Sequence, residues 1–203
     1  MITLYDSRQS GNGWKVRLLL SFLNLPFERK VLDLAAGEAR TLEFLRLNPL
    51  ARVPVLVLDD GTPLVESNAI LIHLARDTPW LPSTPREQSR VLQWLFFEQF
   101  DHLRYFARPR YLVSIARLGE KHADEIAYLR QIGQKALAAL ETRLACTPFL
   151  TGGHCTIADI ALFPYTSMAE MGGYDLRPHP SVCGWIERIR ALPGFIPLIA
   201  DSP

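Results

Sequence analysis

The order of apolar and polar positions at the start of the chain predicts a strand, a polar loop and a buried helix. Residues 2–5 are strand formers, and the run breaks over 6–13, where Ser, Asn and Gly accumulate. From Trp14 the apolar residues are too dense for a single stripe. This density predicts a helix that is covered on several sides and ends at Asn24 and Pro26.

The next fifty residues predict a second helix, a hairpin and a third helix. The expected elements are a half-buried strand over 28–33, a short helix over 39–47, strands over 53–58 and 63–65, and a helix over 66–76. Asp59, Asp60 and Gly61 supply the turn between the last two strands. The predicted order is βαβαββα, with a parallel first crossover and an antiparallel last pair in a small mixed sheet.

A stretch with three prolines, residues 78–86, separates this part from a differently patterned half. We therefore expect domains at 1–77 and 87–203 with a linker between them. Helical periodicity over 87–107, 123–144 and 185–192 predicts that the second domain is all-helical. Pro109 should kink or interrupt the first of these helices, because proline donates no backbone hydrogen bond.

Composition narrows the classes of function. The chain has 203 residues, 48% hydrophobic and 21% charged, which is ordinary globular usage. A formal charge of +1 gives no overall basic footprint for nucleic acid or anionic membrane. The amino terminus lacks a secretory signal pattern and no apolar run is long enough to span a bilayer, so we expect a cytoplasmic protein. The three cysteines form no metal-binding spacing, and we expect reduced thiols and no metal.

A helix start is marked in the second half by Thr156 and Asp159, which precede an apolar run. This spacing has the form of a capping box, in which the two side chains satisfy backbone amides at the helix N-terminus. Such a cap stabilises a helix by about 0.5–2 kcal/mol. The pattern alone therefore predicts a structural cap for a buried helix, with Pro164 bending it.

Four stretches occur in one order along the chain: LYDSRQSGNGWKVRLLL, NPLARVPVL, ESNAI and TIADIALF. Together they resemble the glutathione S-transferase family, specifically its bacterial serine- or asparagine-dependent members of nu or theta type. The resemblance covers essentially the whole chain. It implies a thioredoxin-like N-terminal domain that binds glutathione, a helical C-terminal domain that shapes the second-substrate pocket, a role in detoxification, and a homodimer.

The chemistry that this resemblance implies can be tested against the residues. Glutathione must present a thiolate, and an ordinary thiol has a pKa of about 8.5. Lowering that pKa by about two units requires about 2.7 kcal/mol of preference for the anion. A charge-assisted hydrogen bond contributes about 1.5–3 kcal/mol and a helix N-terminus about 0.3–1 kcal/mol. One well-placed hydroxyl or amide therefore nearly suffices, and Ser10 and Asn12 in the stretch SGNG match the family's catalytic positions.

Other roles for this loop stay open. Ser10 or Asn12 can act only as a helix cap, which is common for both residue types. Ser7 is a competing hydroxyl. Tyr5 lies early for the tyrosine that some branches of the family use.

The resemblance also implies the residues that hold glutathione. Val53 and Pro54 match the family's cis-proline position, where the backbone pairs with the cysteinyl part of the tripeptide like an added strand. Glu66 and Ser67 open a helix, where backbone amides and a hydroxyl suit the γ-glutamyl carboxylate and Glu66 suits its ammonium. Arg52 suits the glycyl carboxylate. The alternatives are an edge-strand proline and an acidic first helical turn with a cap.

Weaker candidates follow from residue type. Lys15, Arg17 and Arg40 are expected to be solvated charges rather than ligands of glutathione. Four aromatic residues are candidates for the second-substrate pocket, which is typically apolar, although such spacings are also typical of a core: Trp14, Tyr105, Phe106 and Tyr111.

The expected partners are glutathione and a small hydrophobic electrophile or a disulfide. The expected activity is conjugation of reduced glutathione to such an electrophile, with glutathione as co-substrate and no resident cofactor. The first 145 residues contain no cysteine, so mixed-disulfide chemistry through a protein thiol is not expected there. Glutathione-dependent reduction of disulfides or peroxides, which can run on two glutathiones, stays open. So does a non-catalytic, transferase-like module that binds another protein.

Overall fold

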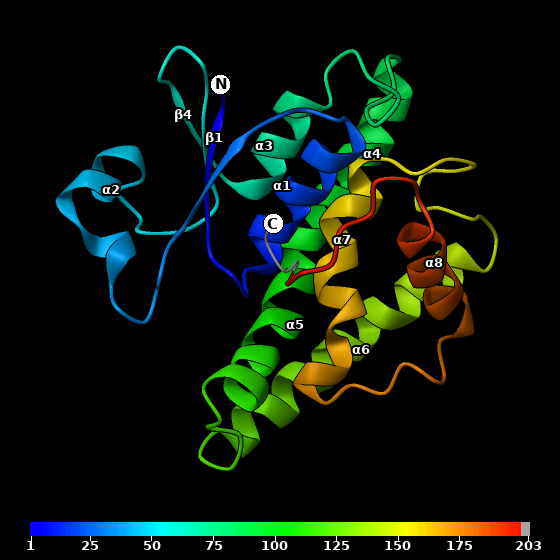
Figure 1. Ribbon diagram of the computed structural model, residues 1–203. Coiled ribbons are helices and arrows are strands. Elements are labelled where there is room, and N and C mark those ends of the chain that lie inside the picture. The colour runs from blue at the N-terminus through cyan, green and yellow to red at the C-terminus, as the bar shows by residue number, and fades with distance from the viewer. Residues whose placement is uncertain (200–203) are drawn as a thin grey trace. The chain divides into compact units, whose positions relative to one another are not determined.

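The computed structural model describes residues 1–199 of the chain, which divide into two compact units (Figure 1). Among the described residues, the first unit comprises residues 1–76 together with 193–199, and the second comprises Asp77–Leu192. No helix among the described residues is long and apolar enough to cross a membrane.

The first unit contains a four-stranded mixed sheet and three α-helices. Its elements are β1 (Thr3–Asp6), α1 (Gly11–Phe22), β2 (Glu28–Val31), α2 (Leu42–Leu47), β3 (Val55–Val57), β4 (Pro63–Val65) and α3 (Ser67–Leu74), with a 3-10 turn at Glu38–Arg40. The strand order is β2-β1-β3-β4. β1 pairs in parallel with β2, whereas β3 is antiparallel to both β1 and β4. The predicted βαβαββα order, parallel crossover and hairpin are confirmed.

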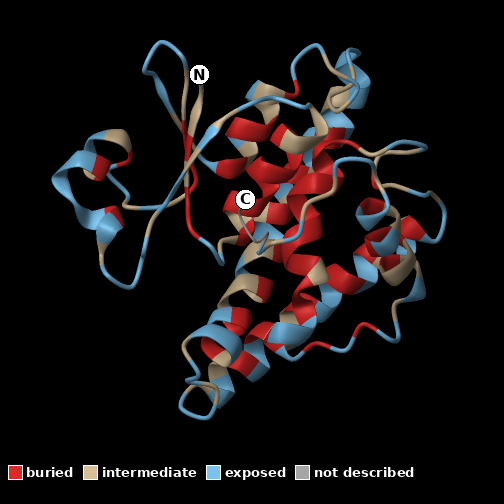
Figure 2. Ribbon diagram, in the orientation of Figure 1, coloured by how far each residue is buried: buried red, intermediate tan, exposed pale blue. Residues whose placement is uncertain are grey.

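The two faces of this sheet carry separate apolar clusters, because successive side chains of a strand point to opposite sides. Leu4 and Leu56 pack with residues of α1 and α3, including Val16, Leu20 and Ile70. The other cluster combines Val55 with residues of the 3-10 turn and α2, and Tyr5 packs against it. The helices α1 and α3 are therefore fixed on one face and α2 on the other. Figure 2 shows how much of α1 and α3 is buried.

The last described residues belong to the first unit, which differs from the predicted helical domain over 87–203. Trp14 of α1 donates its indole N–H to the carbonyl of Ile196 at 2.8 Å, and the Ser21 hydroxyl donates to that of Gly194 at 2.7 Å. Phe195 also lies edge-on to Trp14. The acceptors are backbone carbonyls, which every residue has. The sequence therefore contains no pattern that predicts the packing of this segment against α1.

The second unit is helical, as predicted. Its α-helices are α4 (Pro85–Phe97), α5 (Leu103–Arg110), α6 (Ala123–Leu144), α7 (Ile157–Ser167) and α8 (Pro180–Arg190). Residues Glu98–His102 form a π-helical turn between α4 and α5, a second π turn, Tyr111–Ile115, follows α5, and Ala169–Gly172 is a 3-10 turn. The predicted linker, residues 78–86, thus lies within this unit, and its last two residues are the first residues of α4.

The predicted capping box at α7 is present. The backbone N–H of Thr156 donates to the Asp159 carboxylate at 2.9 Å, and the fully buried Asp159 also accepts from the Leu150 amide at 2.8 Å and the Trp185 indole at 2.9 Å. Burial raises the pKa of Asp159, and these hydrogen bonds oppose that shift. The cap therefore also joins α7 to α8 and to the segment before it.

Pro109 lies inside α5, the helix that it was predicted to kink or interrupt, and α5 gives way to a π turn two residues later. A proline at this position removes the hydrogen bond to the carbonyl of Tyr105, four residues earlier. The hydroxyl of Tyr174 donates to that carbonyl instead, at 2.6 Å. Gly133 makes room for Tyr174, since a Cβ there would lie 2.1 Å from the tyrosine oxygen. The helix continues to Arg110 and passes into the π turn that begins at Tyr111.

We predict that Tyr174→Phe lowers the free energy of unfolding by about 1–3 kcal/mol, because it leaves the partly buried carbonyl of Tyr105 without its donor. In a Pro109→Ala background the amide of residue 109 can serve Tyr105, so the same substitution should cost less. Urea denaturation of the four proteins measures this coupling. Equal losses in both backgrounds would contradict the exchange of donors.

Candidate functional site

Three segments that carry predicted site residues meet at one end of the sheet. Tyr5 of β1 pairs with Val55 of β3, which pairs with Val65 of β4. Because β1 and β4 run antiparallel to β3, the exits from β1 and β4 and the entry to β3 share one edge. The loop before α1, the Val53–Pro54 peptide and the Glu66–Ser67 step are therefore neighbours.

Ser10 is the N-cap of α1. Its hydroxyl oxygen accepts from the backbone N–H of Gly13 at 3.0 Å, and its own amide donates to the carbonyl of Ser7 at 3.1 Å. The alternative in which Ser10 caps the helix is therefore confirmed. It does not exclude catalysis, because a hydroxyl that accepts one hydrogen bond still has a proton to donate.

Asn12 lies in the first turn of α1, where the unshared backbone amides give the helix a positive end. Its side-chain oxygen is buried without a hydrogen-bond partner among the described residues. A buried polar atom of this kind is costly unless a ligand or water satisfies it. The Asn12 oxygen can therefore accept from a donor group that binds at the helix start, while its side-chain N–H group can donate. Ser7, the competing hydroxyl, is 8% exposed and stays open as an alternative.

The Val53–Pro54 peptide bond is cis, as the resemblance implied. The buried Asn48 braces the loop before it: its side-chain N–H donates to the carbonyl of Arg52 at 2.8 Å, and its side-chain oxygen accepts from the amide of Leu50 at 3.1 Å. This bracing role of Asn48 was not predicted from the sequence. The side chain of Arg52 is exposed.

The Glu66–Ser67 step has an unusual backbone. Glu66 has φ 67° and ψ 113°, a region that residues other than glycine rarely adopt and that is common at functional sites. Ser67 opens α3, is 4% exposed, and accepts a hydrogen bond from the Lys15 ammonium at 3.4 Å. This end of α3 offers backbone amides, a hydroxyl and a nearby cation, a combination suited to a carboxylate.

Two charges that we expected to be solvated are buried. Lys15 is 0% exposed and Arg17 is 2% exposed, whereas Arg40 is exposed as predicted. The dense apolar pattern of α1 indicated a helix that is covered on several sides. The same covering buries its two cations. Arg17 reaches the carboxylate of Asp6 at 2.8 Å.

The four aromatic candidates lie in different settings. Trp14 is 4% exposed and packs within the first unit. In the second unit Phe106 is 1% exposed and stacked between His102 and Tyr174, with ring centroids 4.2 and 4.6 Å away. Tyr105 is half-buried and Tyr111 is exposed. Trp14 and Phe106 thus have core packing roles, and a second-substrate role for the four stays a prediction.

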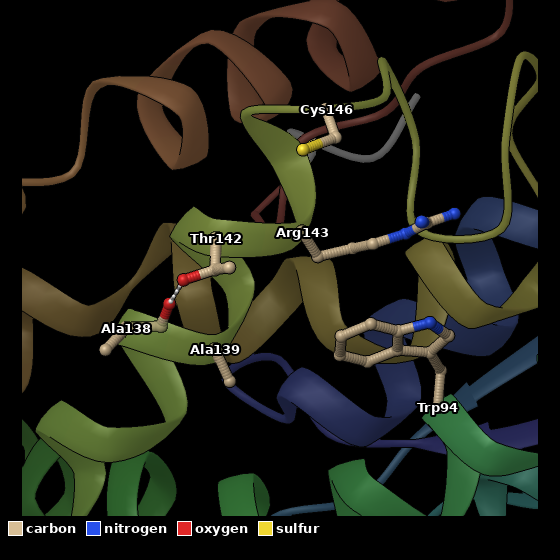
Figure 3. Close-up of a pocket in the computed structure, with 6 residues that line it drawn as sticks. All are labelled: Trp94, Ala138, Ala139, Thr142, Arg143 and Cys146. Atoms are coloured by element: carbon tan, nitrogen blue, oxygen red, sulfur yellow. Dashed lines mark hydrogen bonds between the residues drawn. The ribbon is translucent and has the colours of Figure 1, made fainter.

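The second unit has an open groove of about 640 Å³ that contains none of the predicted site residues (Figure 3). It is lined by Trp94, Ala138, Ala139, Thr142, Arg143 and Cys146. The Arg143 guanidinium is held by the carbonyl of Leu150 at 2.7 Å, and the thiol-bearing Cys146 is exposed.

Family comparison agrees with the architecture of both units. The model of the glutathione S-transferase N-terminal domain matches residues 1–76, and that of the glutathione S-transferase C-terminal domain matches residues 90–193. The chain therefore belongs to the glutathione S-transferase family, a family of enzymes.

Individual relatives agree along nearly the whole chain. The crystal structure of a glutathione S-transferase from Pseudomonas fluorescens has a TM-score of 0.96 and 42% identity, covering 98% of this chain and 99% of that one. The glutathione transferase URE2P6 from Phanerochaete chrysosporium, solved with oxidized glutathione, has a TM-score of 0.86 and 28% identity, covering 95% and 92%. The disulfide-bond oxidoreductase YfcG of Escherichia coli (strain K12) is 33% identical over 95% of this chain and 92% of its own.

Proposed function

We propose that the protein binds reduced glutathione at the sheet edge described above and converts its sulfur to a thiolate with Ser10 and Asn12. The observation that carries this proposal is the start of α1, where the capping hydroxyl of Ser10 still has a proton to give and Asn12, whose side-chain N–H group can donate, lies within the same first turn at the positive end of the helix. The complex of the fungal relative with oxidized glutathione supports the choice of ligand.

The rest of the tripeptide follows from the same edge. The cysteinyl backbone pairs with Val53 before cis-Pro54, as an added strand does. The γ-glutamyl carboxylate binds at Ser67 and the first amides of α3, while Glu66 attracts the ammonium. Arg52, whose side chain is exposed, binds the glycyl carboxylate.

The thiolate then attacks a small apolar electrophile. The sulfur forms a bond to the electrophilic carbon, the leaving group departs with its electron pair, and the thiol proton goes to solvent. Hydrogen bonds from Ser10 and Asn12 favour the anion in the bound state, which supplies most of the about 2.7 kcal/mol that a two-unit drop in pKa requires.

A second candidate is glutathione-dependent disulfide reduction, which the similarity to the E. coli disulfide-bond oxidoreductase favours. The thiolate attacks one sulfur of a disulfide, forms a mixed disulfide with glutathione and releases the other sulfur as a thiolate. The thiolate of a second glutathione then attacks the glutathione sulfur of the mixed disulfide, which forms oxidized glutathione and releases the remaining substrate sulfur as a thiolate. The reaction uses two glutathiones and no protein cysteine, in keeping with a loop that has none.

We also propose a homodimer that uses α4 and the π turn that follows it. Leu92, Phe96 and Phe100 recur every four residues and form one exposed apolar stripe, 37%, 62% and 75% exposed. A stripe of this spacing suits the same stripe of a second copy, packed across a two-fold axis.

The activation step predicts the effect of two substitutions. Ser10→Ala and Asn12→Ala should each lower kcat/KM for conjugation at pH 7 by about tenfold or more and move the acid limb of the pH profile upward, because the thiol pKa returns toward about 8.5. Calorimetry should show glutathione still bound, and Ser10→Thr, which keeps the hydroxyl, should keep most activity. Unchanged profiles in both alanine variants would refute this assignment. Absence of glutathione binding by the native protein would favour a protein-binding module.

Steady-state assays with an aryl halide and with hydroxyethyl disulfide separate the two reactions. We expect turnover of the aryl halide, and we expect any disulfide turnover to survive replacement of Cys146, Cys155 and Cys183 by serine. Faster turnover of the disulfide, with oxidized glutathione as product, would assign the second candidate. Loss of disulfide turnover in the cysteine-free variant would rule out the two-glutathione route.

Sedimentation tests the dimer. We expect the native chain to sediment as a dimer and Phe96→Glu to shift it to monomer, since a buried unpaired charge at each copy opposes association. Leu118→Glu, at an exposed apolar residue outside α4, is the matched control and should stay dimeric. A monomeric native chain at all concentrations would contradict the proposal.

A further inference from the structure

A buried carboxylate lies directly beneath the loop that carries Ser10. Asp6, the last residue of β1, is 0% exposed, and one of its oxygens accepts from the amide of Ser7 at 2.7 Å. A Cβ on Gly13 would lie 1.6 Å from the same oxygen. Only glycine lets the first turn of α1 come this close to the carboxylate.

The carboxylate thus supports both ends of the loop. At one end it fixes Ser7, whose carbonyl accepts from the Ser10 amide; at the other it lies against Gly13, whose amide donates to the Ser10 hydroxyl. The position of the Ser10 oxygen therefore depends on groups that touch Asp6 directly.

Two arginines hold Asp6 in place. Arg17 of α1 donates to its second oxygen at 2.8 Å, and Arg29 of β2 donates to the same oxygen at 2.9 Å. Burial raises the pKa of Asp6, and the two guanidinium groups oppose that shift. Two cations against one anion leave a net positive charge beneath the loop, which also favours an anion above it.

Arg17 also contacts the last described segment of the chain. Its guanidinium donates to the carbonyl of Leu198 at 2.7 Å and to that of Pro197 at 3.5 Å. Arg17 thus makes three contacts, one with the Asp6 carboxylate and two with backbone carbonyls. Only the planar guanidinium of arginine offers several N–H donors in a fixed fork that can make all three. The Asp6–Arg17 ion pair is thus held on one side by Arg29 of the sheet and on the other by the backbone of residues 197–198.

We infer that Asp6 and Arg17 are positioning residues for sulfur activation: together they set where the Ser10 hydroxyl and the first turn of α1 meet the glutathione sulfur. This inference rests on the proposed function. Neither side chain touches the tripeptide in this scheme. Their effect passes through the backbone of Ser7 and Gly13.

The test compares Asp6→Asn and Arg17→Met with Arg29→Met, which removes a bond to the same carboxylate without touching α1. We expect the first two variants to lower kcat about threefold at pH 7, because a one-unit rise in the thiol pKa lowers the thiolate fraction by that factor, with little change in the KM for glutathione. The acid limb of their pH profiles should move up by about one unit. Arg29→Met should move it by less than half as much. Arg17→Lys, which keeps the charge but not the fork, should recover part of the shift.

Urea denaturation and calorimetric binding of glutathione, run on every variant, separate this role from a merely structural one. Variants that bind glutathione but keep the native pH profile would overturn the inference, whatever their stability. If Asp6→Asn does not fold, Arg17→Lys and Arg17→Met decide the question, since Asp6 keeps Arg29 in both. Failure of Ser10→Ala and Asn12→Ala to move the profile would instead refute the proposed function.

Discussion

The pairing register of three strands is the constraint on which the site depends. Because Tyr5, Val55 and Val65 lie side by side, the loop after β1, the cis peptide before β3 and the start of α3 open on one edge of the sheet. A shift by one residue would turn Leu4 and Leu56 out of their core and separate these segments. Burial of the two apolar clusters therefore also fixes the geometry of the binding edge.

The anion preference that we propose for this edge rests mostly on backbone amides and helix dipoles rather than on exposed charge. Two helices, α1 and α3, present their N-termini there; a serine caps α1, and a serine is the first residue of α3. Such groups are held in place before a ligand arrives, so they need little reorganisation when the sulfur or a carboxylate becomes charged. A chain with a formal charge of only +1 can in this way still favour anions locally.

Much of this arrangement was readable from the sequence. Periodicity, turn residues and the capping box gave the order of elements, and the motif around Val53 gave the cis peptide only through resemblance to a family. Other features depend on tertiary contacts that no pattern encodes: the hydroxyl of Tyr174 serving the carbonyl left by Pro109, and the buried Arg17 held by backbone carbonyls near the chain end. In both contacts the acceptor is a backbone carbonyl. Every residue has one, so the sequence does not show which carbonyl a side chain will reach.

The ionisation state of bound glutathione is the most direct test of the account, and ultraviolet difference spectroscopy reads it without any second substrate. Titration of the protein with glutathione near pH 7 should give the absorbance of a thiolate, with a midpoint well below the about 8.5 of an ordinary thiol. A spectrum in which the bound sulfur stays protonated up to that value would contradict the claim that the start of α1 activates it.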